Sequence, residues 1–137
     1  LNMAGYSATP LWRKLGYATG TRAWVTGAPA DYAKLLVMPA DAKVIWLDSP
    51  ERRMASVHAF ATAADALKKQ LTTLRPEIAP TGAVWVSWPK KASGVPTDIT
   101  EDTIRKVALP LGFVDIKVCA VDETWSGLKL VIRKAER

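Results

Sequence analysis

The sequence has little of the chemistry that proteins use for disulfides, metal ions or nucleophilic thiols. Its 137 residues include one cysteine, Cys119, and one histidine, His58. A single cysteine excludes an internal disulfide and a metal site built from cysteines, and such a composition is typical of a reducing compartment. We therefore expect a cytoplasmic protein without a metal ion.

Long apolar runs are also missing. The longest are of strand length, far below the roughly 20 residues of a membrane-spanning helix. The first residues lack the basic and then apolar layout of a secretory signal, so we expect no contact with a membrane. Met3 looks like a natural initiator, and we expect residues 3–137 to form one domain, with Leu1 and Asn2 outside it.

Acidic residues are fewer than basic ones. The chain has 19 Lys and Arg against 13 Asp and Glu, a formal net charge of +6. This excess favours anionic partners such as phosphates, nucleic acid or acidic metabolites, but it does not choose among them. Three basic pairs stand apart in the sequence, unlike a polybasic tail. They are Arg52 with Arg53, Lys68 with Lys69, and Lys90 with Lys91.

Short apolar runs alternate with helical patterns along the chain. Residues 23–25, 44–47 and 83–86 predict strands, and helices are predicted at 30–37, in a long segment between the second and third strands, and at 99–108. The long segment has one apolar face at helical spacing. That face comprises Val57, Phe60, Ala64, Leu67, Leu71 and Leu74. Asp98 and Glu101 have the spacing of a capping box for the last helix.

The last quarter of the chain predicts two strands, 113–121 and 128–132, whose short connection requires an antiparallel pair. Together these elements predict a three-layer, Rossmann-like α/β fold with a mainly parallel five-stranded sheet and a C-terminal antiparallel hairpin. In such sheets ligands bind outside the carboxyl ends of the parallel strands. Four segments should meet there: 27–29, 48–50, 89–97 and 122–125.

The order of elements, the phrase Leu74-Arg75-Pro76 before Gly82 and a strand, and the terminal hairpin resemble the second half of a class I methyltransferase joined to its first strand. This resemblance implies a glycine-rich turn after strand one and an acid at the end of strand two, which together hold S-adenosylmethionine. Here the turn offers only Gly27, followed by Pro29. The residues after it are too few for the usual strand-helix units, so Asp48 is predicted on the wrong strand. S-adenosylmethionine is possible on this basis but disfavoured.

Three longer phrases are similar to a family of small uncharacterised bacterial proteins known only as a domain of unknown function. The phrases are Ala4-Gly5-Tyr6-Ser7 with Thr9-Pro10-Leu11, the loop from Val86 through Trp88-Pro89-Lys90-Lys91 to Gly94, and the hairpin from Val118 through Asp122-Glu123-Thr124-Trp125 to Lys129. The resemblance implies a bacterial origin, and it implies no assigned activity and no known functional residues.

The loop after the third predicted strand is the first candidate site. Lys90 and Lys91, with Ser93, Gly94 and the start of the next helix, could hold a phosphate or a carboxylate. Alternatively, the lysines are solvated and Asp98 already satisfies the helix end. The turn at Gly27 is a weaker candidate for binding phosphate, because Pro29, two residues later, has no backbone N–H to donate.

The hairpin tip is the second candidate. Asp122 and Glu123 could transfer protons or hold a hard metal ion, or they could simply be turn residues. Trp125 is either a lid over a ligand or part of the core. His58 is expected at the boundary of the core, and Cys119 is expected to be an inert strand residue.

Three functions remain open. The favoured one is a non-catalytic module that binds a small anionic ligand or a protein partner at the carboxyl edge. The alternatives are an atypical S-adenosylmethionine-dependent enzyme and a nucleic-acid-binding protein that uses Arg52, Arg53, Lys90 and Lys91. A homodimer through Arg22–Thr26 is also predicted, because this strand is expected at the sheet edge.

Overall fold

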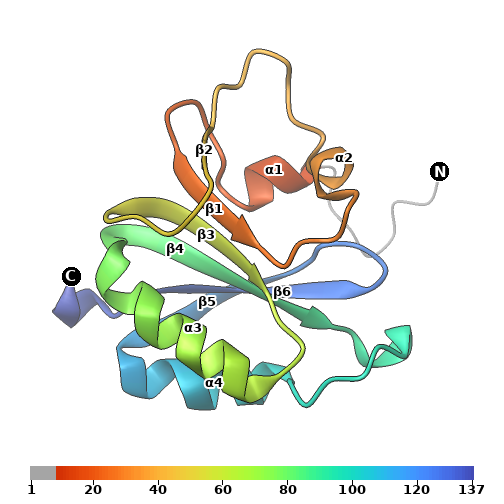
Figure 1. Ribbon diagram of the computed structural model, residues 1–137, viewed down its shortest axis with the longest axis vertical. Helices are drawn as coiled ribbons and strands as arrows, with labels where there is room; N and C mark the ends of the chain where they lie inside the picture. The colour runs from red at the N-terminus through yellow and green to blue at the C-terminus, as the bar shows by residue number, and fades with distance from the viewer. Residues whose placement is uncertain (1–8) are drawn as a thin grey trace.

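A six-stranded sheet forms the centre of the computed structural model, which describes residues 9–137 (Figure 1). The strands are β1 (Arg22–Thr26), β2 (Ile45–Leu47), β3 (Met54–Phe60), β4 (Ile78–Pro89), β5 (Phe113–Ala120) and β6 (Trp125–Ile132). Their order is β2-β1-β3-β4-β6-β5, with β1 to β4 parallel and β6 antiparallel to both β4 and β5. The mainly parallel sheet with a closing hairpin is therefore confirmed, with six strands instead of five. The expectation that the domain begins at Met3, with Leu1 and Asn2 outside it, concerns residues that lie outside the described range.

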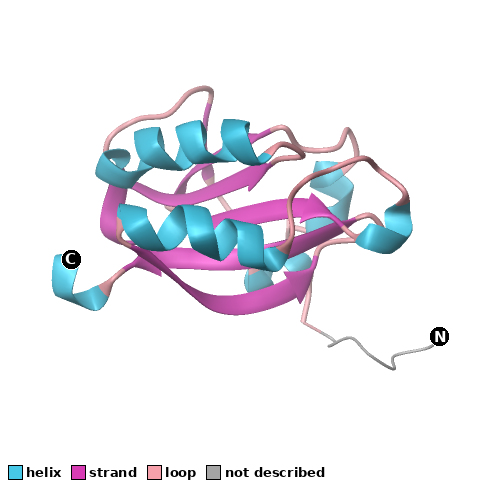
Figure 2. Cartoon of the chain, turned by 90° about the horizontal axis from the view of Figure 1, so that it is seen from below, coloured by secondary structure: helices cyan, strands magenta, loops and turns pink. Residues whose placement is uncertain are grey.

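Helices cover both faces of the sheet. On one face lie α1 (Leu11–Lys14) and α2 (Tyr32–Leu36); on the other lie α3 (Ala64–Glu77) and α4 (Glu101–Ala108), side by side in Figure 2. Because side chains alternate along a strand, β4 contributes to both layers: Val84 and Val86 pack under α3 and α4, and Trp85 packs under α1 and α2. Within residues 9–137, no helix is long and apolar enough to cross a membrane.

The single long helix predicted between the second and third strands was wrong in its first part. Residues Met54–Phe60 form β3, which pairs with both β1 and β4, and the helix begins only at Ala64. Val57 and Phe60, three residues apart, point to opposite faces of the sheet and enter different clusters. A strand buried on both faces has a nearly continuous apolar run, which can mimic helical spacing.

The capping box predicted for the last helix was also wrong. Thr100 is the N-cap of α4: its Oγ1 accepts a hydrogen bond from Thr103 N at 3.2 Å, and Thr103 Oγ1 accepts one from Thr100 N at 3.1 Å. Asp98 serves a different helix, because its Oδ1 accepts a hydrogen bond from Ala64 N at 2.8 Å, at the start of α3. The loop before α4 is thereby fastened to α3.

The strand Arg22–Thr26 is not at the edge of the sheet. It lies between β2 and β3, because α2 returns the chain to the free side of β1 and β2 pairs there in parallel. The sheet edges are β2 and β5. The unpaired amides on which the predicted homodimer rests therefore belong to those two strands and not to β1.

Candidate ligand site at the carboxyl edge

The turn after β1 passes directly over the end of β3. Gly27 has a φ of +72°, and a Cβ added to it would lie 2.8 Å from the carbonyl oxygen of Phe60. An L-residue would be strained in this left-handed conformation and would collide with the backbone. Only glycine therefore allows the turn after β1 to come this close to the end of β3. This close approach agrees with the expectation that the strand ends meet at the carboxyl edge.

Asp48 follows the strand next to β1. The register pairs Trp24 with Leu47, so Asp48 leaves the sheet beside the last residues of β1, and its side chain is exposed. The prediction that Asp48 lies on the wrong strand was therefore wrong. One short unit, β1-α2-β2, is enough to place an acid on the neighbouring strand. This position corresponds to the end of strand two in the methyltransferase resemblance.

A pocket of about 590 Å³ lies between β1, the residues that follow β2 and β3, and one side of α3 from Ala66 to Leu74. Trp24 and Pro50 provide apolar walls, and Lys69 and Gln70 of α3 provide polar ones. The residues that follow β3, including Thr62, complete the lining. Sequence reasoning missed this pocket, because assigning residues 54–60 to a helix hid the end of β3 that forms one wall.

The loop after β4 and the hairpin tip come together as expected, but their polar groups bind each other. Lys90 Nζ donates a hydrogen bond to the carbonyl oxygen of Asp122 at 2.6 Å, and Ser93 Oγ donates to the carbonyl oxygen of Lys90 at 2.6 Å. Asp122 Oδ1 accepts hydrogen bonds from Thr124 N at 2.8 Å and from Trp125 N at 2.7 Å. The bond from Lys90 to Asp122 joins the two loops, and the other three bonds hold each loop in its own shape.

Lys91 and Glu123 are exposed at these loops, and Gly94 has a φ of +76°, which ends the turn Lys91–Ser93. A second pocket, of about 530 Å³, lies beside this region and is lined by Lys14, Lys90 and Glu123 among others. The two lysines favour an anion there, whereas the carboxylates of Asp122 and Glu123 oppose one. This pocket is where the small-anion hypothesis applies.

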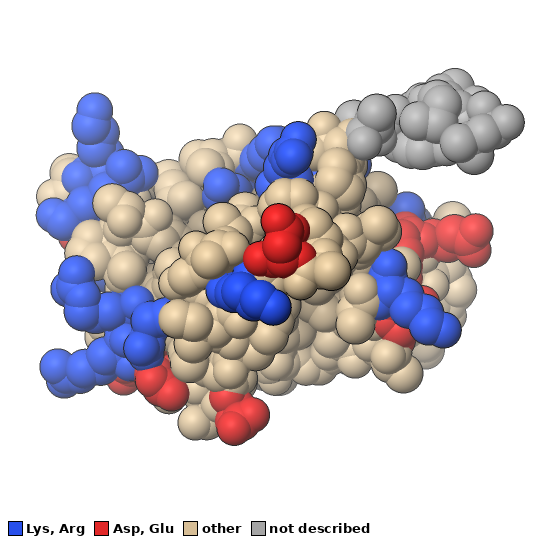
Figure 3. Space-filling view, turned by 90° about the horizontal axis from the view of Figure 1, so that it is seen from above, with Lys and Arg blue, Asp and Glu red and all other residues tan. Residues whose placement is uncertain are grey.

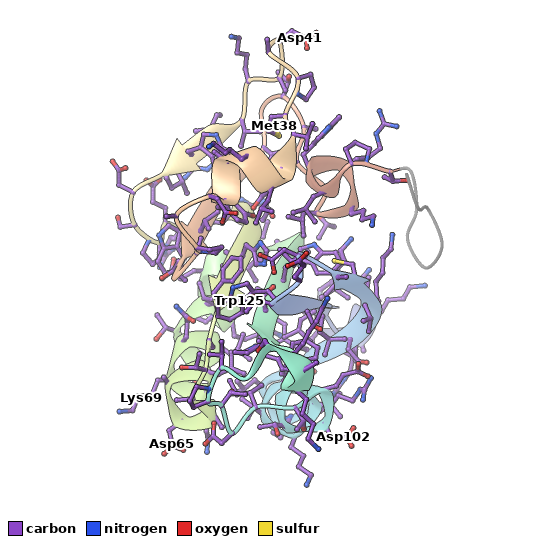
Figure 4. All side chains as sticks on the ribbon, turned by 90° about the vertical axis from the view of Figure 1, so that its right-hand side faces the viewer. Met38, Asp41, Asp65, Lys69, Asp102 and Trp125 are labelled. Atoms are coloured by element: carbon purple, nitrogen blue, oxygen red, sulfur yellow. The ribbon has the colours of Figure 1, made fainter. Side chains whose placement is uncertain are left out.

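Trp125 packs inward. Its ring lies edge-on to Phe60 at a centroid distance of 5.1 Å, and it is half-buried among residues of the α1 and α2 layer. Figure 4 shows Trp125 in the middle of the molecule, beneath α1 and α2. Of its two interpretations, this packing favours the core over the lid.

A chain of hydrogen bonds crosses the buried layer beneath this edge. Tyr17 Oη lies 2.7 Å from Tyr32 Oη, which lies 2.7 Å from His58 Nδ1, and His58 Nε2 lies 2.7 Å from Ser87 Oγ. The expectation of a boundary position for His58 was wrong, since its side chain is 0% exposed. Burial lowers the pKa of His58 to about 3, and burial raises the pKa of Tyr17 to about 12 despite an opposing contribution from its hydrogen bond to Tyr32.

The four basic residues of the nucleic-acid hypothesis do not form one surface. Arg52 and Arg53 come immediately before β3, whereas Lys90 and Lys91 come immediately after β4. Because β3 and β4 are parallel neighbours, the two pairs lie at opposite ends of the sheet.

Comparisons with known proteins show the fold. No protein-family model matches the sequence, and no curated protein matches it. Among solved structures, an S-adenosylmethionine-dependent methyltransferase from Aquifex aeolicus is similar with a TM-score of 0.64 and 14% identity, over 88% of this chain and 86% of that one. A 1,6-didemethyltoxoflavin-N1-methyltransferase from Burkholderia thailandensis has a TM-score of 0.60 and 15% identity, over 90% and 75%.

A possible exported protein from Bordetella parapertussis is similar with a TM-score of 0.60 and 10% identity, over 90% of this chain and 66% of that one. At these identities the likeness defines the fold alone. The protein has the Rossmann-like fold of class I S-adenosylmethionine-dependent methyltransferases in a shortened form. Its resemblance to an uncharacterised bacterial family stays a prediction, since no family model matches.

Proposed function

We propose that the protein binds an adenosine-containing ligand, with S-adenosylmethionine as the first candidate, at the carboxyl edge between β1, β2 and α3. The observation that carries this proposal is the exposed Asp48 at the end of the strand next to the Gly27 turn. In Rossmann-like folds an acid in this kind of position accepts hydrogen bonds from ribose hydroxyls. The ligand would thus lie across the ends of β1 and β2.

The pocket that includes Pro50, two residues after Asp48, has the size and chemistry for a flat base. Its volume of about 590 Å³ lies within the range of about 300 to 1,000 Å³ that is usual for small-molecule sites. Trp24 and Pro50 offer apolar surface, and the amide of Gln70 offers both a donor and an acceptor. These groups suit the adenine of the proposed ligand.

The turn after β1 fits the rest of S-adenosylmethionine less well. Gly27 allows a close approach, but Pro29 removes one of the amide donors that such a turn would present. The site is therefore better fitted to the adenosine half of the cofactor than to its amino-acid half. For this reason the proposal is ligand binding, and no residue is assigned a catalytic role.

Methyl transfer is the second candidate function, and the fold comparisons favour it, because several of the similar solved structures are of proteins named as methyltransferases. When bound, S-adenosylmethionine would supply an electrophilic methyl group. Asp48 and Gln70 would orient the nucleoside. The separation of Arg52 and Arg53 from Lys90 and Lys91 argues against nucleic acid bound across one face.

Isothermal titration with S-adenosylmethionine, S-adenosylhomocysteine and adenosine tests the binding proposal. We expect Asp48→Asn to weaken affinity about tenfold or more, because a charged acceptor of two hydrogen bonds is lost. Asp41→Asn is the matched control, since Asp41 is also an exposed loop acid and lies at the far tip of the molecule in Figure 4. Equal affinity in both variants, or no heat at millimolar ligand, would contradict the proposal.

Transfer of a labelled methyl group to a cellular extract would separate methyl transfer from binding alone.

A further inference from the structure

The amino end of the sheet, opposite the carboxyl edge, contains arginines that already hold a carboxylate. Nη2 of Arg75 lies 3.1 Å from Oε1 of Glu136, and Nη1 of Arg133 lies 3.3 Å from Oε2 of the same side chain. Arg75 Nε also donates a hydrogen bond to the carbonyl oxygen of Leu111 at 3.0 Å, which fixes the orientation of its guanidinium group. Two arginines thus share one carboxylate, which the C-terminal segment of the chain supplies.

Gly112 leaves the space for this contact. A Cβ added there would lie 2.6 Å from Glu136 Oε1 and 3.0 Å from Arg75 Nε. Its φ of +96° also favours glycine. The arginine and the carboxylate therefore lie directly against the backbone, and a side chain at residue 112 would push them away from these positions.

Two further arginines line the same hollow, a pocket of about 370 Å³. Arg52 and Arg53 are exposed, and within residues 9–137 neither forms an ion pair with a carboxylate. Arg53 has a φ of +60°, an uncommon conformation for a residue with a side chain, and its backbone N donates a hydrogen bond to Glu77 O at 2.5 Å. Backbone strain of this kind is concentrated at functional sites.

Positive charge is in clear excess at this end of the molecule. Lys and Arg side chains gather at the left of Figure 3, the end at which β1 and β3 begin in Figure 1. Arg52, Arg53, Arg75 and Arg133 belong to this end, and Glu136 is the carboxylate shared by two of them. The pocket lining itself contains three guanidinium groups, those of Arg52, Arg53 and Arg75, against the one carboxylate of Glu136, so the pocket favours a further anion.

We propose that this arginine pocket binds a phosphate-bearing small molecule, whose oxyanion displaces Glu136 from Arg75. The planar guanidinium group matches phosphate with two parallel hydrogen bonds. Ile78, Pro80 and Ile132 form the other walls, and they limit the polar contacts to the arginine side. The site lies at the other end of β3 from the proposed adenosine site and does not depend on it.

A small ligand fits better than nucleic acid. A nucleic-acid surface needs basic groups spread along a stripe, whereas these arginines converge on one hollow and Lys90 and Lys91 lie at the opposite end of the sheet. The volume of about 370 Å³ is at the low end of the usual range for small-molecule pockets. Both points favour a compact phosphate or diphosphate group.

Titration calorimetry with pyrophosphate at constant ionic strength tests the proposal. We expect the double variant Arg52→Gln with Arg53→Gln to bind about tenfold more weakly or worse, because two charge-assisted contacts are lost. The matched control is Lys106→Gln with Lys117→Gln, which removes the same charge from exposed positions of α4 and β5. We expect the control to change the affinity less than about twofold, since distant surface charges are screened.

The variant Glu136→Gln should change the affinity for pyrophosphate in the opposite direction. Removing the internal competitor should tighten pyrophosphate binding roughly threefold or more, an effect that loss of structure would not produce. Equal weakening in both double variants would overturn the proposal, because it would reveal general charge attraction. Absence of binding to both the natural protein and Glu136→Gln would overturn it as well. Binding of a duplex oligonucleotide without any binding of pyrophosphate would assign the surface to nucleic acid instead.

Discussion

His58 lies between two hydroxyl groups in the middle of the sheet, and both ring nitrogens are engaged. A neutral imidazole donates through one nitrogen and accepts through the other, which suits Tyr32 on one side and Ser87 on the other. Phe60 stacks on the ring at a centroid distance of 4.2 Å. A protonated ring would place a charge in an apolar layer without an acid to pair with it. Burial is therefore the cause of the lowered pKa.

This environment predicts how stability depends on pH. The pKa of His58 is lowered to about 3 in the folded protein, whereas it is about 6.5 in the unfolded chain. Between these values the unfolded chain binds the extra proton, so the free energy of unfolding falls as the pH falls below 6.5. The expected loss at pH 5 is about 2 kcal/mol.

Urea denaturation at pH 7 and pH 5 measures this loss. His58→Gln cannot titrate, so its free energy of unfolding should change less between the two pH values than that of the natural protein. The comparison is made within each protein, and any general destabilisation by the substitution therefore cancels. The same pH dependence in both proteins would contradict the prediction.

At the scale of elements, α3 depends on a segment far away in the sequence. Its N-cap residue is Ala63, whose side chain cannot accept a hydrogen bond, and Asp98 from the loop before α4 takes over this role at Ala64 N. Thr97 strengthens the attachment, because its Oγ1 donates a hydrogen bond to the carbonyl oxygen of Thr62 at 2.7 Å. The start of α3, which lines the proposed ligand pocket, is thus held by the loop that follows β4.

Replacing Asp98 should therefore loosen the start of α3. We expect Asp98→Ala to lower the free energy of unfolding by about 1 kcal/mol, the usual cost of losing a helix cap. Asp41→Ala, at an exposed loop position, should stay within about 0.5 kcal/mol of the natural protein. Thermal or urea denaturation of the three proteins provides the measurement. Equal stability of the two variants would show that α3 does not need this cap.

At the scale of the whole molecule, self-association depends on the free edges of the sheet. The β2 edge is only three residues long, Ile45–Leu47, and both Ile45 and Trp46 are exposed. Ile45 N donates a hydrogen bond to Thr21 O at 2.8 Å, toward the β1 side. Because successive residues of a strand alternate in direction, the backbone groups of Trp46 point away from the sheet. The predicted homodimer would then use β2 and not Arg22–Thr26.

The variant Trp46→Pro removes the backbone N–H of residue 46, which points away from the sheet, and keeps the hydrogen bond of Ile45 N to Thr21 O. We expect it to convert a dimer of the natural protein into a monomer, because an added strand would lose its hydrogen-bond donor. Trp46→Val is the matched control, since it also loses the ring but retains the amide. Light scattering at high protein concentration distinguishes the states. A monomeric natural protein would contradict the dimer, and a dimeric Trp46→Pro would place its interface elsewhere.

Local patterns in the sequence were enough to predict the fold class. Apolar runs of strand length, separated by turn residues, predicted β1, β2 and β4, and the short connection before Trp125 predicted the closing hairpin. The rule that parallel strands share one carboxyl edge correctly brought Lys90 next to Asp122. These features depend on residues close together in the chain, which is why they can be predicted from sequence.

The order of the strands was decided only by the tertiary structure. Whether residues 54–60 form a helix or a strand depends on pairing with β1 and β4, and whether Asp48 lies beside Gly27 depends on which side of β1 the next strand joins. The meeting of Arg52, Arg75 and Glu136 likewise joins three distant segments. Contacts of this kind leave no periodic signal in the sequence, because the free energy that fixes them comes from packing between elements and not from local preference.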